Sequence, residues 1–395
     1  MNVILFDAQE RAHLLPLTYT KPVAELRVGI LKIIEKWNRY LSTDCSFLTQ
    51  DYLQEKFPAR IEEQNLLING ALLPNPDLVE KIAVLKNREA LSVGTTLLAI
   101  NLEKADLLDF FSGKLETYTN IDYEGDVHRI QNTWDIFSLN GEEIKADYQL
   151  LTHKRQSEPI SSTVQVLGKE NVFFEKGAKA EFMTINATDG PVYIGKDAEL
   201  MEGSIVRGPF ALGEHSVVKM GAKIYGPTTI GPESKVGGEL NNVVIQGYTN
   251  KAHDGFLGNS VIGEWCNLGA DTNNSNLKNN YAEVRLWNYQ TEGFAKTGLQ
   301  FCGLIMGDHS KCGINTMFNT GTVVGVSANI FGSGFPRNFI PSFSWGGASG
   351  FVVYQTKKAF EVAQKVFERR GLKFDQTEEK ILIHIFEETQ KYRKA

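Results

Sequence analysis

Isoleucine, leucine or valine stands at every sixth position of one long stretch of this chain. The eight positions are Ile194, Leu200, Val206, Leu212, Val218, Ile224, Ile230 and Val236. A period of six matches neither the period of about 3.6 of an α-helix nor the alternation of an ordinary strand. It is the period of a three-sided parallel β-helix, in which each side takes six residues and turns one aliphatic side chain inward.

The repeat continues beyond Val236 with changes of register. It restarts at Val244, Phe256, Ile262 and Leu268, while two asparagines, Asn250 and Asn274, fall at inward positions. After an excursion over roughly residues 275–300 it returns at Met306, Cys312, Phe318, Val324 and Ile330. We therefore predict a β-helix of about six or seven coils, between residues 170 and 340.

Composition excludes several classes of partner. The net charge is −6 and no basic cluster stands out, which argues against a nucleic-acid-binding protein. No apolar run approaches the ~20 residues of a membrane span, and residues 2–6 read as a strand and not as a signal peptide. The four cysteines form no C-x-x-C pair, and Cys312 reads as a reduced core thiol. We expect a cytoplasmic protein that binds neither nucleic acid nor membrane.

The chain divides into an amino-terminal domain, a bridge, the β-helix and a tail. Residues 1–150 contain both strand and helix patterns, with predicted strands at 2–6, 66–68 and 95–100 and predicted helices at about 28–41 and 103–112. Residues 151–169 form a polar linker, residues 170–345 the β-helix, and residues 346–395 the tail. Within the tail, Lys357–Arg370 and Thr377–Arg393 are predicted amphipathic helices separated by Gly371.

The segment Leu15-Pro16-Leu17-Thr18-Tyr19-Thr20-Lys21-Pro22 follows the first strand. This order resembles the opening of sugar-1-phosphate nucleotidyltransferases, in which a glycine-rich loop and basic side chains hold a nucleoside triphosphate. The resemblance implies an α/β, shortened Rossmann-like domain. It also implies that Arg11, Lys21 and Arg27 bind the nucleotide, although the loop Ala8–His13 contains no glycine.

The family's metal-binding aspartate has no counterpart after the strand at 66–68, because the chain reads Asn69-Gly70 there. Trp134-Asp135-Ile136-Phe137 resembles the segment that closes the family's domain. Since Mg²⁺ leaves much of its coordination shell to water and phosphate, one carboxylate is enough in principle. We therefore predict Asp135 or Asp126 as the Mg²⁺ ligand.

The segment Asn250-Lys251-Ala252-His253-Asp254-Gly255-Phe256-Leu257-Gly258 carries the densest chemistry. It resembles the acetyltransferase half of the bifunctional N-acetylglucosamine-1-phosphate uridyltransferase/glucosamine-1-phosphate N-acetyltransferase family, whose β-helix is left-handed. The resemblance implies that His253 is the general base, a role that needs a pKa near 7. It also implies a sugar-phosphate site containing Lys251, Phe256, Asn273, Asn276 and Lys278.

In that family acetyl-CoA lies along the later coils, between neighbouring β-helices. The small and polar residues near Cys312–Thr322 suit a pantetheine arm, and we predict contacts from Ile314, Asn315 and Thr322. A site at the edge of one β-helix is completed by a symmetry mate, which predicts a homotrimer. The resulting prediction is a transferase that acetylates glucosamine-1-phosphate and then couples N-acetylglucosamine-1-phosphate to a nucleotide.

Three other interpretations stay open on the sequence. The chain could be a sugar-1-phosphate nucleotidyltransferase, similar to glucose-1-phosphate thymidylyltransferases, with the β-helix as a trimerisation scaffold only. It could be a γ-type carbonic anhydrase, which needs three zinc-binding histidines; His215, His253 and His309 lack the expected spacing. The β-helix could also be purely structural.

Overall fold

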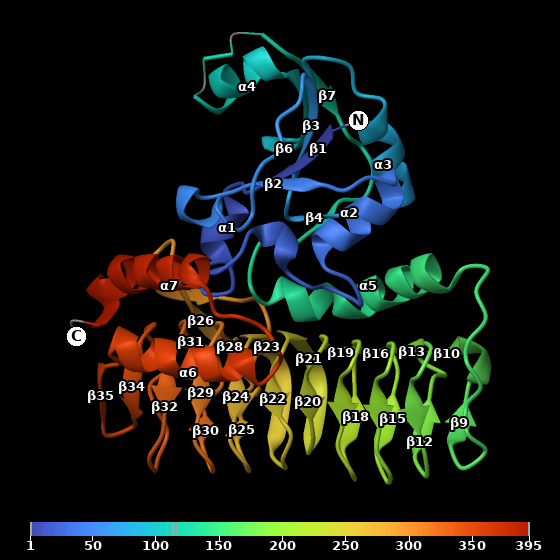
Figure 1. The fold of residues 1–395 in the computed structure, drawn as a ribbon, viewed down its shortest axis with the longest axis vertical. Helices are drawn as coiled ribbons and strands as arrows, with labels where there is room; N and C mark the ends of the chain where they lie inside the picture. The colour runs from blue at the N-terminus through green and yellow to red at the C-terminus, as the bar shows by residue number, and fades with distance from the viewer. Residues whose placement is uncertain (1, 113, 116, 394–395) are drawn as a thin grey trace. The chain divides into compact units, whose positions relative to one another are not determined.

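The computed structural model describes residues 2–112, 114–115 and 117–393. The chain forms two compact units. The amino-terminal unit comprises Met1–Leu14, Thr20–Leu26 and Leu31–Asn132, and the β-helix unit comprises Leu15–Tyr19, Arg27–Ile30 and Thr133–Ala395. The expected combination of an α/β domain, a parallel β-helix and carboxyl-terminal helices is confirmed (Figure 1).

The amino-terminal unit is built on a six-stranded sheet in the order β2-β1-β3-β6-β5-β7. Its strands are β1 (Asn2–Phe6), β2 (Ser46–Leu48), β3 (Gln64–Asn69), β5 (Glu89–Val93), β6 (Thr96–Glu103) and β7 (Thr119–Asp122). The short strands β4 (Leu72–Leu73) and β8 (His128–Arg129) pair beside it. β1 is parallel to both of its neighbours, and its apolar run is buried, as is typical of a central parallel strand.

Four helices accompany this sheet: α1 (Glu10–His13), α2 (Ile33–Leu41), α3 (Pro76–Ala83) and α4 (Lys104–Phe111). α3 starts where Asn75 accepts a hydrogen bond from the Leu78 amide and proline takes the first helical position. The helix predicted at 103–112 is confirmed by α4. The helix predicted at 28–41 begins only at Ile33, because Gly29 has a positive φ of 85° and the preceding residues belong to the other unit.

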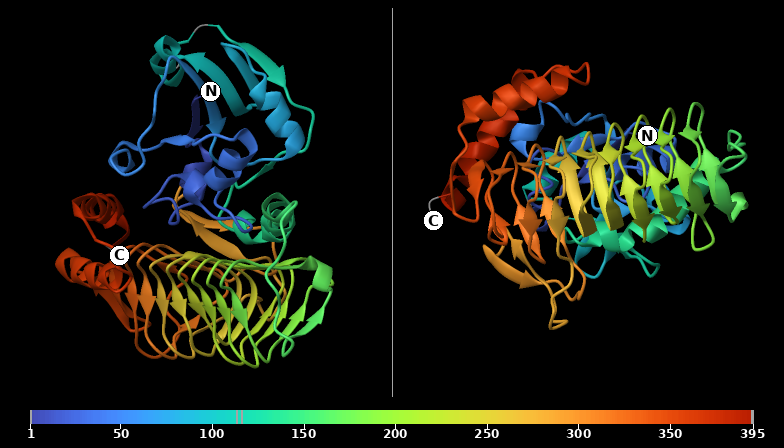
Figure 2. Two further views of the ribbon diagram at one scale, coloured as in Figure 1. Left: turned by 45° about the vertical axis from the view of Figure 1, so that its right-hand side comes forward. Right: turned by 90° about the horizontal axis from the view of Figure 1, so that it is seen from below.

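The β-helix has three parallel faces (Figure 2). Face 1 consists of β10 (Val172–Phe174), β13 (Val192–Ile194), β16 (Phe210–Leu212), β19 (Thr228–Ile230), β21 (Glu239–Gly247), β23 (Phe256–Glu264), β28 (Leu304–Met306), β31 (Thr322–Val324) and β33 (Phe339–Ile340). Face 2 consists of β11 (Lys179–Ala180), β14 (Glu199–Leu200), β17 (Val217–Val218), β20 (Lys235–Val236), β22 (Asn250–Lys251), β24 (Asn267–Leu268), β29 (Lys311–Cys312), β32 (Asn329–Ile330) and β34 (Ser344–Gly347), with β35 (Gly350–Val353) antiparallel at its end. Face 3 consists of β9 (Gln165–Leu167), β12 (Thr184–Asn186), β15 (Ile205–Arg207), β18 (Lys223–Tyr225), the first halves of β21 and β23, β25 (Asn273–Asn274) and β30 (Met317–Phe318).

The predicted period is confirmed where it is regular. All eight aliphatic side chains from Ile194 to Val236 lie in the core of the β-helix. Ile194 pairs with Leu212, and Leu212 with Ile230, so one coil takes eighteen residues there. Face 1 has nine strands among the described residues, more than the predicted six or seven coils, partly because later coils are shorter. From Ile230 to its partner Ile245, for example, a coil takes only fifteen residues.

The short coils also correct the predicted inward positions. The side chains that enter the core are Ile245 and Leu257, each one position after the predicted Val244 and Phe256. Because neighbouring residues of a strand face opposite sides, a shift of one position exchanges inside and outside. The same shift puts Lys251, and not Asn250, opposite Val236. Asn274 is confirmed as a buried inward residue.

Three further segments complete the β-helix unit. α5 (Asp135–Thr152) is fixed through its buried Asn140, which accepts hydrogen bonds from the Gly29 amide and Thr229 and donates to the Pro227 carbonyl. The excursion after Asn274 contains the antiparallel pair β26 (Arg285–Asn288) and β27 (Gly293–Lys296). The predicted tail helices are confirmed as α6 (Thr356–Glu368) and α7 (Gln376–Glu388), which lie beside the last coils in Figures 1 and 2.

Candidate functional site

His253 lies at the corner between β22 and β23, where face 2 turns into face 3. Its side chain is exposed and is not buried among the aliphatic residues of the core. The corner is tight: Gly255 has a φ of 117°, and a Cβ there would overlap the Thr272 carbonyl of the next coil. The Asp271 amide donates to the Asp254 carbonyl at 3.0 Å and joins the two coils. The backbone therefore holds the imidazole at the solvent edge of the β-helix.

Lys251, which the sequence predicts as a substrate contact, lies inside the β-helix. It occupies an inward position, with 1% of the residue exposed. Its Nζ donates to the carbonyl oxygens of His253, at 2.6 Å, and Asp254, at 3.2 Å. Burial lowers the pKa of Lys251 to about 8. The ammonium group thus supports the corner that carries His253 from inside the β-helix.

This burial predicts a pH-dependent stability. Between pH 8 and 10.5 the unfolded chain holds more protons at Lys251 than the folded chain does, so the free energy of unfolding rises with pH. We expect the free energy of unfolding of the parent, relative to Lys251→Met, to rise across this window by about 2 to 3 kcal/mol, since one pKa unit corresponds to ~1.4 kcal/mol. Denaturant unfolding of both proteins at several pH values measures the difference. A difference that stays constant would contradict the assignment.

Three other predicted substrate residues gather next to this corner on face 3. Asn273 accepts a hydrogen bond from the Phe256 amide at 2.7 Å and donates to the Asp271 carbonyl at 2.9 Å. A Cβ at Gly258 would overlap both the Phe256 ring and the Asn276 amide, so these two side chains lie over Gly258. Lys278 instead donates to the Glu283 carbonyl at 3.0 Å, within its own loop.

Of the predicted acetyl-CoA residues, Ile314 and Asn315 lie at the surface and Thr322 lies in the interior. The Asn315 amide donates to the Ala270 carbonyl at 2.8 Å, which places Ile314 and Asn315 on the same edge as His253, two coils further on. At ~4.8 Å per coil this is roughly 10 Å along the axis. Ile314 is 70% exposed. Thr322, by contrast, is fully buried and donates to the Asn319 carbonyl, so its side chain is not available to a ligand.

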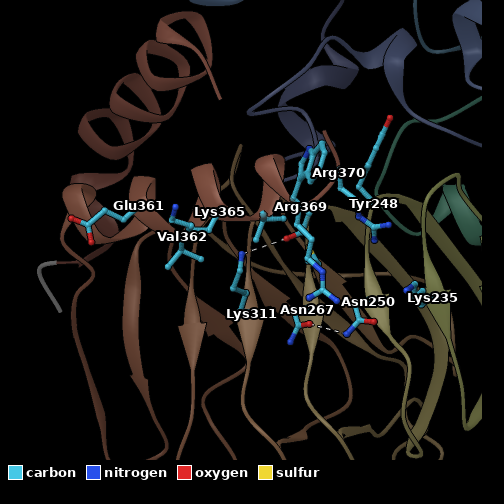
Figure 3. Close-up of a pocket in the computed structure, with 13 residues that line it drawn as sticks. Lys235, Tyr248, Asn250, Asn267, Lys311, Glu361, Val362, Lys365, Arg369 and Arg370 are labelled. Atoms are coloured by element: carbon cyan, nitrogen blue, oxygen red, sulfur yellow. Dashed lines mark hydrogen bonds between the residues drawn. The ribbon is translucent and has the colours of Figure 1, made fainter. Parts of the chain in front are cut away.

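A groove of about 820 Å³ lies between face 2 and α6, and we call it the basic groove (Figure 3). The residues that line it are Lys235, Tyr248, Asn250, Trp265, Cys266, Asn267, Lys311, Glu361, Val362, Lys365, Val366, Arg369 and Arg370. Five of these side chains are cationic and one is a carboxylate. Two cations are paired, Lys365 with Glu368 at 2.9 Å and Arg370 with Glu233 at 3.2 Å. The excess of positive charge favours a ligand with several phosphate groups.

The walls of the basic groove are held together by aromatic stacking. The Trp265 ring lies 4.2 Å from the Tyr248 ring and 4.1 Å from the Phe367 ring of α6. On the floor, Asn250 donates to Asn267 at 2.9 Å. Lys311 donates to the carbonyls of His309, at 2.9 Å, and Trp265, at 3.4 Å, and burial lowers its pKa to about 8.

The basic groove and His253 share one face of the β-helix. Asn250 lines the groove, and His253 follows three residues later at the other edge of the same coil. Three residues of extended chain span at most ~10 Å. Two coils further on, Lys311 lines the groove and the exposed Ile314 follows three residues later at the other edge of the face. This groove was not predicted from the sequence, because its lysines and arginines come from separate strands and from the region of α6 and belong to no motif.

A second hollow, of about 400 Å³, lies in the amino-terminal unit at the carboxyl ends of β1 and β3. We call it the amino-terminal cleft. It is lined by Phe6, Ala8, Gln9, Glu10, His13, Asn69, Thr95, Thr96, Leu97, Arg129 and Gln131. Ligands of open α/β sheets bind at such carboxyl ends where the chain leaves a strand to either side, as it does here from β1 to β2 and then to β3.

None of the three predicted nucleotide-binding cations lines this cleft. Arg11 donates to the Tyr52 hydroxyl at 2.8 Å and lies 3.6 Å from Asp7. Lys21 is buried in the amino-terminal unit. Arg27 is buried in the β-helix unit, where its guanidinium donates to the carbonyls of Ile30 and Gln246. The cation that does line the cleft is Arg129, which was not predicted from the sequence because it lies on a two-residue strand outside any motif.

The two aspartates predicted as alternative metal ligands belong to different units. Asp126 is exposed in the amino-terminal unit, and Asp135 opens α5 in the β-helix unit. Among the described residues, no three or more histidine, cysteine, aspartate or glutamate side chains gather into a potential metal site. This finding gives no support to the zinc interpretation. Within the described part of the chain, no helix has the length and apolarity needed to cross a membrane.

One comparison with known proteins agrees with the resemblance at the amino terminus, and a second concerns a shorter segment. Residues 3–156 match the family described as sugar nucleotidyl transferase. A segment of 89 residues is 34% identical to the bifunctional protein GlmU of Methanocaldococcus jannaschii, and covers 22% of this chain and 21% of that protein.

Similar solved structures include two UDP-N-acetylglucosamine acyltransferases. The Arabidopsis protein has 15% identity and a TM-score of 0.26, over 55% of this chain and 78% of that chain. The Campylobacter jejuni protein has 15% identity and a TM-score of 0.22, over 59% and 97%.

Proposed function

We propose that this chain is a bifunctional transferase acting on amino-sugar phosphates. The β-helix unit acetylates glucosamine-1-phosphate with acetyl-CoA, and the amino-terminal unit couples N-acetylglucosamine-1-phosphate to a nucleoside triphosphate. The observation that carries the proposal is an exposed His253 at one edge of the face whose other edge forms the basic groove. A base and a polyanion site on the same face of the β-helix suit transfer from a coenzyme A thioester to an amine.

In the proposed acetyl transfer, the amine nitrogen of the sugar attacks the thioester carbonyl carbon. His253 takes the proton that the nitrogen loses, the carbon–sulfur bond breaks, and the thiolate leaves and is protonated. The phosphates of coenzyme A occupy the basic groove, while Ile314 and Asn315 border the path of the pantetheine arm. Phe256, Asn273 and Asn276 border the sugar. Lys251 supports the corner without touching the substrate.

In the proposed nucleotidyl transfer, a phosphate oxygen of the sugar phosphate attacks the α-phosphorus of the nucleotide. The bond from that phosphorus to the bridging oxygen breaks, and pyrophosphate leaves. The family match over residues 3–156 supports this half, and the amino-terminal cleft is the place that we assign to it. The resemblance implies Mg²⁺, but neither Asp126 nor Asp135 lines this cleft.

Two separate assays on the purified chain test the two halves. One offers glucosamine-1-phosphate with acetyl-CoA and measures thiol release. The other offers N-acetylglucosamine-1-phosphate with UTP or dTTP and measures pyrophosphate release. Pyrophosphate release without any thiol release would favour the second candidate, a nucleotidyltransferase with a β-helix scaffold, which the family match over residues 3–156 also allows.

The basic groove makes a prediction about affinity. Reversing two charges with Lys365→Glu and Arg369→Glu is expected to raise the KM for acetyl-CoA at least about tenfold, since a hydrogen bond to a charged group contributes ~1.5–3 kcal/mol. The kcat at saturating acetyl-CoA should change little, because neither residue lies at the His253 corner. Lys357→Glu with Lys358→Glu is the matched control, since it makes the same change on α6 outside the groove lining. Equal effects of both pairs would contradict a specific site.

We further propose a cytoplasmic homotrimer. Face 3 presents outward and exposed apolar side chains, among them Leu167, Ile205 and Tyr225, along the face that also carries Phe256. Such a stripe is typical of a surface that a partner covers. Light scattering should give three times the 44.1 kDa of one chain. A monomer at the concentrations used in the assays would contradict the trimer.

A further inference from the structure

The amino-terminal cleft contains one carboxylate, and that carboxylate is already paired with a cation. Among the residues that line the cleft, the only acid is Glu10, and it is buried. Arg129 Nη1 lies 2.9 Å from its Oε1 and donates to Thr96 Oγ1 at 3.0 Å. Arg129 Nη2 donates to Gln131 at 3.1 Å. A guanidinium group is therefore fixed in the cleft by three neighbours.

The rest of the donor set in this cleft does not fit a divalent cation. At the end of β3, Asn69 accepts a hydrogen bond from the Ala71 amide at 2.9 Å and donates to the Leu97 carbonyl at 3.3 Å. The Asn69 amide group also donates to Glu10 Oε1 at 3.5 Å, so both of its polar atoms already have partners. The predicted ligands Asp126 and Asp135 do not line the cleft. Mg²⁺ prefers carboxylate oxygens in octahedral geometry, and the cleft offers it only a carboxylate that already faces an arginine.

We propose that Arg129 takes the place of the divalent cation, and that the cleft binds the phosphates of a nucleoside triphosphate independently of Mg²⁺. A guanidinium group carries a permanent charge and offers a planar fork that matches two phosphate oxygens. Glu10 orients the fork and, as a buried negative charge beside the ligand, also weakens binding. This inference rests on the proposed nucleotidyl transfer, because it assigns the ligand of that half.

Calorimetric titration of the full chain with UTP, dTTP, ATP, GTP and CTP, in excess EDTA and in excess Mg²⁺, tests the inference. For the nucleotide that binds, we expect dissociation constants within about threefold in the two buffers. Arg129→Gln should weaken binding in EDTA at least about tenfold, which corresponds to ~1.4 kcal/mol. Glu10→Gln should tighten it severalfold, and a gain in affinity cannot come from partial unfolding. Arg155→Gln, which breaks a comparable arginine–carboxylate pair in the β-helix unit, should change nothing.

The outcomes separate the inference from the proposed function. Binding that requires Mg²⁺, or that survives Arg129→Gln, would overturn the inference and leave the nucleotidyl half standing. Absence of binding by all five nucleotides in both buffers would remove the nucleotidyl half and the inference with it. Arg129→Lys keeps the charge and loses the fork, so we expect an affinity between those of the parent and Arg129→Gln.

Discussion

Replacing His253 with alanine is expected to lower the kcat of acetyl transfer by about 10²- to 10⁴-fold, the usual contribution of a positioned general base. The amine of the sugar would then lose its proton to water without a fixed acceptor. The KM for both substrates should change by less than about threefold, because the groove cations remain. Folding should be unaffected, since substitutions of exposed residues usually change stability by less than ~0.5 kcal/mol.

The same variant separates the candidate functions. Pyrophosphate release by the amino-terminal unit should be unchanged, so the loss is confined to thiol release. His215→Ala is the matched control, because His215 is also an exposed histidine at a corner of the β-helix, on a coil before the groove. Full acetyl transfer by the His253 variant would remove the general base from the proposal.

Gly255→Ala is expected to have the largest effect on stability, with a loss of about 3 kcal/mol or more. Two costs add: an alanine at a φ of 117° is strained by ~1–3 kcal/mol, and its Cβ overlaps the Thr272 carbonyl, which can only be relieved by moving backbone. Because Gly255 lies two residues after His253, the shifted corner should also reduce acetyl transfer. Thermal and denaturant unfolding measure the loss of stability, and the thiol-release assay measures the loss of acetyl transfer.

Gly221→Ala is the control for this prediction. Gly221 stands at the equivalent corner of an earlier coil, with a φ of 69°, and a Cβ added there would meet no described atom within 4 Å. It should cost only the ~1–2 kcal/mol of a left-handed residue and leave acetyl transfer intact. Equal losses in the free energy of unfolding for Gly255→Ala and Gly221→Ala would mean that the close contact between coils at Gly255 has no cost for a side chain. That result would contradict a rigid corner.

The sequence predicts this fold well where the chain repeats without interruption. From Ile194 to Val236 a single period sets the inward residues, because each coil has the same length and the same three corners. The prediction failed at Val244 and Phe256, where a coil loses three residues and inside and outside change places. No local signal marks such a loss, since Val243, Val244 and Ile245 are all aliphatic and all buried.

The candidate sites were predicted less completely, for physical reasons. His253 belongs to a dense motif, and its exposed corner agrees with the role that the motif implies. Lys251 belongs to the same motif, but it occupies an inward position that aliphatic side chains hold in other coils. A charged side chain is not expected at such a position. Arg129 and Lys311 carry no motif at all. They become candidates only when distant strands bring them to the edge of a hollow.

The stacking of equal coils also has a consequence for how this molecule can change length. In a solenoid each repeat touches only its immediate neighbours, so its energetics are nearly one-dimensional. The register from Ile194 to Leu212 to Ile230 means that the removal or duplication of eighteen residues there keeps the inward positions of the remaining coils aligned. The number of regular coils between Ile194 and Val236 could therefore differ without a change in the later coils, which carry the proposed acetyl-transfer site.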